Sequence, residues 1–124
     1  MVRYSATATD HFRNPRNLGR LDEADGVGTA RDAENLVTIA VRVRAGRIAE
    51  ARFRALACNA CVAAASVATT LLPGLSLSEA AALRGEQLVA ALDGLPPEKR
   101  HCAELVAEAA RRAAAAAQAG RARH

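Results

Sequence analysis

Alternation of apolar and polar positions predicts two β-strands in the first half of the chain. From Val37 to Val43 every second residue is valine or isoleucine, and the residues between them are small or polar. This period of two is typical of a half-buried strand, here predicted over 36–44. The alternation resumes over 48–56 after Ala45-Gly46, so the two strands are expected to form an antiparallel hairpin. The glycine-rich segment 17–34 is predicted to be a loop.

A short helix is predicted before the hairpin. Tyr4, Ala8 and Phe12 recur at every fourth position, which places them on one face of a helix over 4–12. Asn14-Pro15 is expected to end this helix, because a residue that precedes proline is disfavoured in the α region.

Further helices are predicted after the hairpin. Residues 61–72 combine small and apolar side chains at the density of a buried helix. Ser76 and Glu79 have the spacing of a capping box, which begins the next helix. Another short helix is expected from Gly85 to about Asp93-Gly94.

The C-terminal quarter is predicted to end in one long helix. Residues 95–99 contain two adjacent prolines and are expected to be non-helical. The alanine-rich run 101–119 follows as a helix that Gly120 closes, and 119–124 are expected to form a disordered tail. Helix, hairpin and several helices in this order are typical of an α+β fold. A chain of 124 residues is long enough for one domain, 1–124, with one core.

Composition narrows the classes of function. The formal net charge is +4, and the positive charge is almost all arginine, spread along the chain. Aromatic residues are only Tyr4, Phe12 and Phe53, so a base-stacking surface for nucleic acid is not expected. No apolar run approaches the roughly 20 residues that cross a bilayer, and the first residues lack the layout of a secretory signal. We therefore expect a cytoplasmic protein without nucleic-acid or membrane partners, in which thiols stay reduced.

Three cysteines and one histidine form two clusters with the ligand chemistry of a soft metal. Cys58 and Cys61 are separated by two residues, and His101 directly precedes Cys102. Thiolate and imidazole groups are the ligands that Zn²⁺ and iron–sulfur units prefer. The alternative is that the cysteines are small buried apolar residues, since free cysteine is among the most buried residue types.

The predicted helices bring these side chains together. Cys58 and Cys61 fall in the first turn of one helix, where residues three apart are neighbours. His101 and Cys102 fall in the first turn of another helix. A helix N-terminus stabilises a thiolate and lowers its pKa, so two facing helix starts are expected to form a small electropositive pocket for sulfur ligands.

Several motifs resemble the NifU/IscU-type scaffold proteins of iron–sulfur cluster assembly. The resemblance covers roughly residues 4–114, with the motifs in the family's order. The motifs are Asp10-His11-Phe12-Arg13-Asn14-Pro15-Arg16-Asn17, Gly28-Thr29, Ala51-Arg52-Phe53-Arg54, Cys58, Ser76-Leu77-Ser78-Glu79-Ala80, Leu95-Pro96-Pro97-Glu98-Lys99 and His101-Cys102. The first motif and the run that ends at Cys102 are the most specific.

The resemblance implies a fold of the SufE/NifU type, with a small three-stranded antiparallel sheet packed against several helices. It also implies a scaffold or carrier rather than an enzyme, which holds a [2Fe-2S] cluster built with sulfur from a cysteine desulfurase. Cys58 and Cys102 would correspond to two of the three cluster cysteines, with His101 as the adjoining histidine. Cys102 would also be able to accept sulfur as a persulfide.

The resemblance further implies a set of protein partners. Leu95, Pro96, Pro97 and Lys99 would belong to a loop that an Hsp70-type chaperone reads with its co-chaperone. Recipient apoproteins would take the finished cluster. The two prolines have an equally simple structural interpretation, because they are a rigid lead-in to the last helix.

One departure from the family concerns the ligand set. The family's first cysteine lies in an Ala-Cys-Gly-Asp element, where this chain has Asp32-Ala33-Glu34-Asn35 in a shortened loop. The Ala33 methyl binds no metal, and the Asn35 amide is a weak neutral ligand. Cys61 is an additional thiol, and it favours a relocated set that holds a [2Fe-2S] cluster or Zn²⁺. This set is Cys58, Cys61, His101 and Cys102. The alternative for Cys61 is a small packed side chain.

Three functions stay open at this point. The first is a cluster scaffold or carrier with an atypical ligand set. The second is a non-scaffolding paralogue that holds structural zinc, or no metal, and binds the desulfurase or the chaperone. The third is a sulfur acceptor, in which Cys102 or Cys58 takes a persulfide and passes it on. For His11 and Arg16 in the first motif, a role in locking the first helix is favoured over a partner surface.

Overall fold

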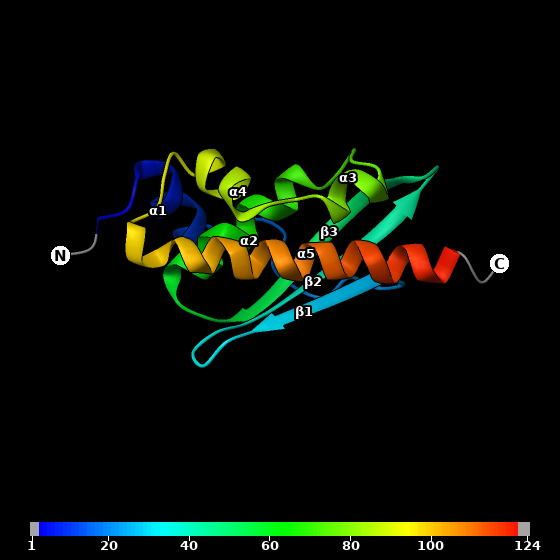
Figure 1. Ribbon diagram of the computed structural model, residues 1–124, viewed down its shortest axis with the longest axis horizontal. Helices are drawn as coiled ribbons and strands as arrows, with labels where there is room; N and C mark the ends of the chain where they lie inside the picture. The colour runs from blue at the N-terminus through cyan, green and yellow to red at the C-terminus, as the bar shows by residue number, and fades with distance from the viewer. Residues whose placement is uncertain (1–2, 122–124) are drawn as a thin grey trace.

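A three-stranded antiparallel sheet and one long helix organise the fold (Figure 1). The computed structural model describes residues 3–121. The long helix α5 crosses one face of the sheet, with β1 along one side of it and the short helices α3 and α4 along the other. The architecture is α+β, as predicted. The elements are α1 Ala6–Arg13, β1 Gly26–Arg31, β2 Leu36–Arg44, β3 Arg47–Leu56, α2 Asn59–Leu71, α3 Leu77–Ala81, α4 Gly85–Ala91, a 3₁₀ turn Pro97–Lys99 and α5 Arg100–Arg121.

The predicted hairpin is confirmed as β2 and β3. The two strands pair in antiparallel register, with Val37 opposite Ala55 and Ile39 opposite Phe53. Ala45 and Gly46 connect them with positive φ angles of 53° and 78°. A two-residue turn of this kind matches the right-handed twist of the strands that it joins.

The prediction of a loop over 17–34 is wrong for Gly26–Arg31, which form strand β1 and pair with β2. Burial alternates along β1, with Gly26, Gly28 and Ala30 buried and the residues between them exposed. This alternation of buried and exposed residues cannot be recognised from hydrophobicity, because glycine has no apolar side chain. Glycine is also a signal for loops. The three-stranded sheet implied by the family resemblance is therefore confirmed.

The first helix begins at Ala6, two residues after its predicted start at residue 4, and the capping box predicted at Ser76 is confirmed. The Ser5 hydroxyl oxygen accepts a hydrogen bond from the Ala8 N–H and begins α1. At the start of α3, the Ser76 hydroxyl accepts from the Glu79 N–H, and the Glu79 carboxylate accepts from the Ser76 N–H. This reciprocal pair satisfies two backbone donors that the helix itself leaves unpaired.

Two predictions for the C-terminal part are wrong. Pro97–Lys99 form a 3₁₀ turn, because proline is compatible with the first turn of a helix. The helix α5 continues to Arg121, so Gly120 does not close it and residues 119–121 are helical instead of a tail. Ala117, one turn earlier, packs against Gly26 of β1 and stabilises this end. Residues 122–124 of the predicted tail lie outside the described part of the chain.

The sheet and α5 approach each other at a distance that requires glycine in β1. A Cβ atom on Gly26 would lie 2.1 Å from the Ala113 carbonyl oxygen, and one on Gly28 would lie 2.1 Å from the Ala109 carbonyl oxygen. The facing side of α5 is built from buried alanines. Small residues on both surfaces let the backbones come close, which is how an alanine-rich core with few aromatic residues fills its space.

The first motif of the family resemblance locks the end of α1 onto α2. His11 Nδ1 is hydrogen-bonded to Ser66 Oγ at 2.8 Å, and the Arg16 N–H donates to the same oxygen at 2.9 Å. The Asn17 amide donates to Thr69 Oγ1 at 3.1 Å. Ser66 and Thr69 are fully buried, so these bonds supply partners to polar groups in the core. The structural interpretation of His11 and Arg16 is supported by these contacts.

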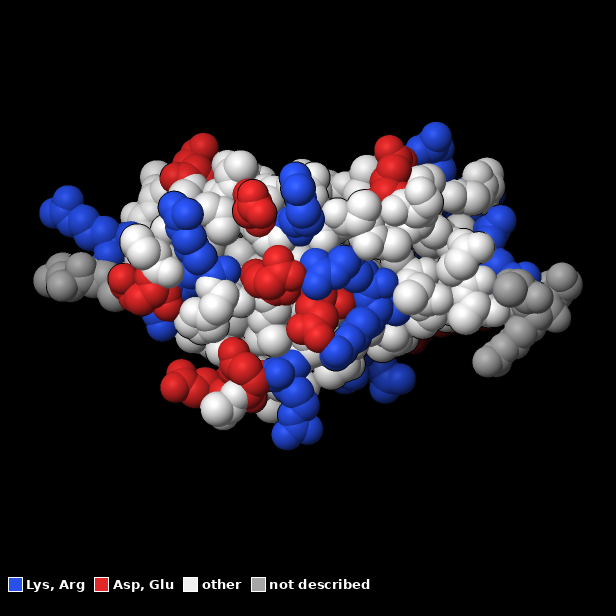
Figure 2. Space-filling view, viewed as in Figure 1, with Lys and Arg blue, Asp and Glu red and all other residues white. Residues whose placement is uncertain are grey.

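The exposed side of α5 carries charges of both signs (Figure 2). Arg111 pairs with Glu104 at 2.8 Å, and Arg112 pairs with Glu108 one turn away. The mixture leaves no concentrated patch of one sign on this face. Within residues 3–121, no helix is long and apolar enough to span a membrane.

Gly28→Ala tests the contact between β1 and α5. The added methyl would overlap the Ala109 backbone, so we expect the free energy of unfolding to fall by about 3 kcal/mol. Gly120→Ala is the control, since its methyl would meet only the Asp25 carbonyl oxygen at 3.9 Å. It should stabilise α5 by up to about 1 kcal/mol. Urea unfolding followed by circular dichroism compares the variants, and equal midpoints would contradict the packing.

Ser66→Ala tests the lock on the first motif. The variant leaves the His11 ring and the Arg16 N–H without their shared partner, which should lower the free energy of unfolding by about 2 kcal/mol. Thr70→Ala is the control in the same helix, because this hydroxyl bonds only to the Val67 carbonyl and its loss should cost less than about 0.5 kcal/mol. Thermal unfolding that does not separate the two variants would argue against the lock.

Candidate metal centre

Three thiol groups converge where two helices begin. Cys58 is the N-cap of α2, Cys61 lies in the first turn of that helix, and Cys102 lies in the first turn of α5. The three sulfur atoms all lie within 4.8 Å of one another. The sulfurs of Cys58 and Cys102 are 3.5 Å apart. We call these three residues the thiol cluster.

The predicted histidine lies at the edge of the thiol cluster. His101 Nε2 is 3.6 Å from the Cys102 sulfur, and the imidazole is exposed to solvent. The four residues singled out from the sequence are therefore neighbours in the fold. His101 approaches the cluster from the solvent side, whereas Cys61 forms its fully buried floor.

The pKa values of Cys61 and Cys102 are shifted in opposite directions by their surroundings. Hydrogen bonding to Cys102 and burial raise the pKa of Cys61. The pKa of Cys102 is lowered to about 6, chiefly because the Cys61 thiol donates to it, with further contributions from Cys58, His101 and Lys99. Cys102 is thus the thiolate of the cluster at neutral pH, and its neighbours stabilise that charge.

The loop between β1 and β2 contacts Cys58 through Asn35 and contributes no atom to the thiol cluster. The Asn35 side-chain oxygen accepts a hydrogen bond from the Cys58 N–H at 2.9 Å. Its amide nitrogen donates to both carboxylate oxygens of Asp32, at 3.1 and 3.2 Å. The Asp32 carboxylate also accepts from the backbone N–H groups of Glu34 and Asn35, and these donors lower its pKa.

Sequence reasoning treated Asn35 only as a lost carboxylate and missed these bonds. Asn35 is only 5% exposed, and its buried amide makes its hydrogen bonds to Asp32 and Cys58 within the protein. The spacing of Asp32 and Asn35 is a signal for a local turn closed by a side chain. The bond to Cys58 has no such signal, because it joins residues that are distant in sequence.

The predicted partner loop is partly buried. Leu95 and Pro96 pack into the protein, whereas Pro97 is exposed and Lys99 is half-buried. Electrostatic interactions, first with Cys58, raise the pKa of Lys99. A role of this loop in partner binding stays a prediction, and its accessible part is the segment around Pro97.

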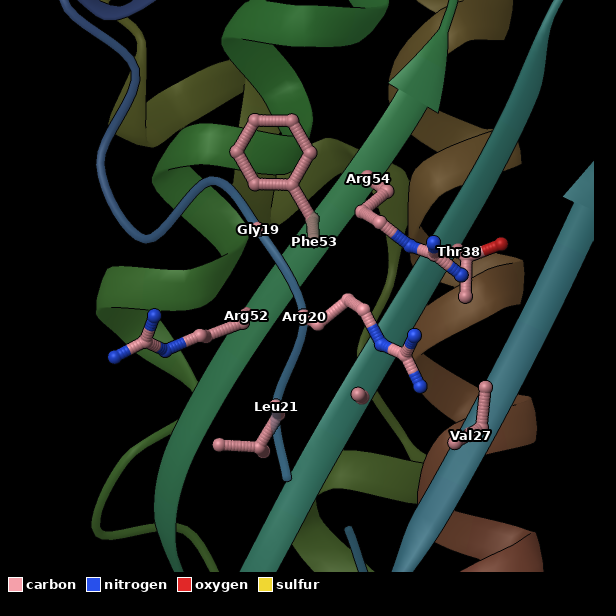
Figure 3. A pocket seen from close by; sticks show the side chains of 9 residues that line it. Gly19, Arg20, Leu21, Val27, Thr38, Arg52, Phe53 and Arg54 are labelled. Carbon is pink, nitrogen blue, oxygen red and sulfur yellow. The ribbon is translucent and has the colours of Figure 1, made fainter. Parts of the chain in front are cut away.

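A hollow on the opposite face of the sheet has a different chemistry (Figure 3). Its volume is about 120 Å³, and its lining includes Arg20, Val27, Thr38 and Arg54. Figure 3 shows the guanidinium groups of Arg20 and Arg54 extending over β2. The lining contains no thiol or imidazole, so the soft-ligand chemistry of the described residues is concentrated at the helix starts.

Comparison with known proteins gives the thiol cluster a context. Residues 3–123 match the NifU-like N terminal domain. The chain is 41% identical over 112 residues to "Iron-sulfur cluster assembly scaffold protein IscU 1" of Archaeoglobus fulgidus, covering 89% of this chain and 73% of that protein. It is 36% identical over 118 residues to the IscU scaffold protein of Haemophilus influenzae, covering 90% and 93%.

Solved structures support the same fold. A scaffold protein for the SUF system from Fervidobacterium islandicum superposes with a TM-score of 0.75 at 16% identity, covering 90% of this chain and 96% of that one. A NifU-like N-terminal domain from Brucella abortus has a TM-score of 0.59 at 23% identity, covering 94% and 82%. At these identities the likeness concerns the fold alone.

The metal-free protein should show one thiolate that forms near pH 6. Cys102 has its pKa lowered to about 6, so ultraviolet thiolate absorbance should rise as the pH passes that value, and Cys102→Ser should remove this step. Because the folded-state pKa lies below that of the unfolded chain, the ionised thiol stabilises the fold at alkaline pH, and this contribution is lost as the pH falls through about 6. An unchanged titration in Cys102→Ser would assign the step to another group.

Proposed function

The chain belongs to the NifU-like N-terminal domain family, and we propose that it is a scaffold or carrier in iron–sulfur cluster assembly. It binds a [2Fe-2S] cluster or Zn²⁺ through Cys58, Cys61 and Cys102, with His101 as the fourth ligand. The observation that carries this proposal is the thiol cluster, whose sulfurs lie within 4.8 Å of one another. The names of the relatives support the same role.

The sulfur spacing fits a single tetrahedral ion. Ligand sulfurs around one zinc lie about 3.8 Å apart when each Zn–S distance is about 2.3 Å. The sulfurs of Cys58 and Cys102 are 3.5 Å apart, and all three sulfurs lie within 4.8 Å of one another. The ligand atoms that lie within 4.8 Å of one another are the three sulfurs and do not include a His101 nitrogen. The exposed imidazole, with Nε2 3.6 Å from the Cys102 sulfur, would turn toward the thiol cluster to become the fourth ligand. A [2Fe-2S] cluster divides its ligands between two irons, so the cluster would require the thiol cluster to widen toward solvent.

The electrostatics of the pocket favour anionic sulfur. Both Cys58 and Cys102 lie at helix N-termini, where backbone N–H groups and the helix dipole stabilise negative charge. The positive charge of Lys99 interacts electrostatically with Cys58 and Cys102. Metal binding requires the thiols to lose their protons, and the lowered pKa of Cys102 favours this loss.

Cys61 supplies the thiol that the β1–β2 loop lacks. Ala33 stands where the family resemblance places the first cysteine, and a methyl group cannot bind a metal. The Cys61 sulfur completes the cluster from the first turn of α2. Because the ligand lies on a buried helix, it is held in place before any metal arrives.

A second candidate function is a sulfur acceptor, and the acidity of Cys102 favours it. A thiolate is the nucleophilic form of cysteine, and Cys102 is the thiol with the lowered pKa. A persulfide on Cys102 would come from a cysteine desulfurase. Its half-buried neighbour Cys58 is 3.5 Å away and could receive the sulfur next.

Partners and setting follow from the proposed role. We infer a cysteine desulfurase as the sulfur donor, recipient apoproteins as acceptors, and an Hsp70-type chaperone with its co-chaperone at the loop around Pro97. On this proposal the protein holds and passes on its cargo without catalysing a reaction of its own. A cytoplasmic location and the absence of nucleic-acid and membrane partners stay predictions.

Metal content of the purified protein tests the proposal. After aerobic expression we expect about one Zn²⁺ per chain, with Zn–S distances of about 2.3 Å by X-ray absorption. Cys58→Ala, Cys61→Ala and Cys102→Ala should each weaken Zn²⁺ affinity more than about 100-fold, since even outer-shell partners are worth about 10- to 100-fold. Val62→Ala, the next residue of α2, is the control and should keep its metal.

The outcomes separate the three functions. Iron with labile sulfide after anaerobic purification supports the scaffold, stoichiometric zinc that does not exchange supports a structural-zinc paralogue, and persulfide on metal-free protein supports the sulfur acceptor. Only oxygen and nitrogen neighbours around bound zinc would overturn the ligand set. Full metal retention in Cys61→Ala would make Cys61 a packing residue.

A further inference from the structure

We propose that Asn35 is a positioning residue that holds the β1–β2 loop against Cys58 and thereby slows the loss of metal from the thiol cluster. The inference rests on the proposed function, because it concerns retention at the same site. The three thiol ligands do not themselves require a contact between the β1–β2 loop and Cys58, yet Asn35 makes one. One buried amide bridges the backbone of a proposed ligand and a carboxylate of the loop.

The side-chain amide of Asn35 acts both as a hydrogen-bond acceptor and as a donor. Its oxygen accepts from the Cys58 N–H, and its nitrogen donates to the Asp32 carboxylate. Cys58 is the residue at which the chain leaves β3 and enters α2. The position of the Cys58 N–H fixes the direction of that entry, and the sulfur moves with it. A bond to this N–H therefore acts on the geometry of the thiol cluster.

The loop end of the bridge is also fixed. The Asp32 carboxylate accepts three kinds of N–H donor, from the Glu34 backbone, the Asn35 backbone and the Asn35 side chain. These bonds close the loop into a compact turn and hold the carboxylate in its ionised form. The loop is thus tied down at Asp32 and joined through Asn35 to the helix that carries Cys58.

Asparagine is required in this bridge because it is a donor and an acceptor at once. Aspartate at position 35 would still accept from the Cys58 N–H, but its second oxygen would face the Asp32 carboxylate about 3 Å away. Two carboxylates at that distance repel each other. The bridge would open on the loop side, although the two side chains have nearly the same shape.

Exchanging the two residues restores the bridge with the charge moved. In Asp32→Asn combined with Asn35→Asp, the new carboxylate at 35 accepts from both the Cys58 N–H and the amide at 32. The amide oxygen at 32 accepts from the two backbone N–H groups of the loop. Four of the five hydrogen bonds of the original bridge have a counterpart in the exchanged pair, and only one of the two bonds between the Asn35 amide nitrogen and the Asp32 carboxylate is lost.

The first test measures the rate at which Zn²⁺ passes from the zinc-loaded chain of 124 residues to a chromogenic chelator. Asn35→Asp should release zinc about tenfold faster than the original protein, which is the usual effect of losing an outer-shell partner. The exchanged pair should return to within about twofold of the original rate. Glu34→Gln is the matched control, because it removes a charge from the same exposed loop and should leave the rate unchanged.

The exchanged pair distinguishes the bridge from a simple effect of charge. If a carboxylate at position 35 itself promoted release, both Asn35→Asp and the exchanged pair would accelerate it, and the proposal would be overturned. Unchanged release in Asn35→Asp would overturn it as well. Unfolding of the metal-free variants by urea shows whether any faster release only follows a general loss of stability, which would also contradict a positioning role.

A second readout needs no metal. Hydrogen exchange of the Cys58 amide, followed by NMR, should be slow in the original protein and in the exchanged pair, and faster in Asn35→Asp. If the original protein binds neither zinc nor an iron–sulfur cluster, the proposed function fails, while this measurement still decides whether Asn35 holds Cys58. Equal exchange rates in all three proteins would overturn the bridge.

Discussion

The close contact between β1 and α5 is the constraint on which the rest of the structure depends. Gly26 and Gly28 let the backbone of β1 touch the backbone of α5, and the alanine face of α5 completes the contact. This contact fixes α5 across the sheet. Because a helix is a rigid rod, fixing its C-terminal half against β1 also fixes where its first turn lies. That first turn carries His101 and Cys102.

The thiol cluster forms because two helices that are far apart in the sequence, α2 and α5, begin at the same place in the fold. β3 ends beside the loop that follows β1, and there the chain turns into α2 at Cys58. α5 begins at the same place after the turn Pro97–Lys99. Each helix start brings unpaired N–H groups and positive potential. The sulfur atoms therefore meet in the part of the fold best suited to negative charge.

Local signals were enough to predict much of this fold and of the site. The hairpin, the capping box at Ser76 and the first turns that hold the cysteines depend on residues within a few positions of one another, and the structure confirms them. The strand β1 could not be predicted in this way. Its glycines are explained by the backbone of α5, a contact that no short window of the sequence contains. The same is true of Asn35, whose acceptor role depends on Cys58.

Moving a ligand from a loop to a helix changes what holds the metal on the proposed function. A cysteine at position 33 would bind only while the loop lies over the site, so loop opening would remove a ligand. Cys61 lies on the buried face of α2 and does not move with the loop. The loop of this chain still touches the site, through the bond between Asn35 and Cys58. On the proposed function, the loop would therefore act on the backbone that orients Cys58, because the three thiol ligands come from the starts of α2 and α5 and none comes from the loop.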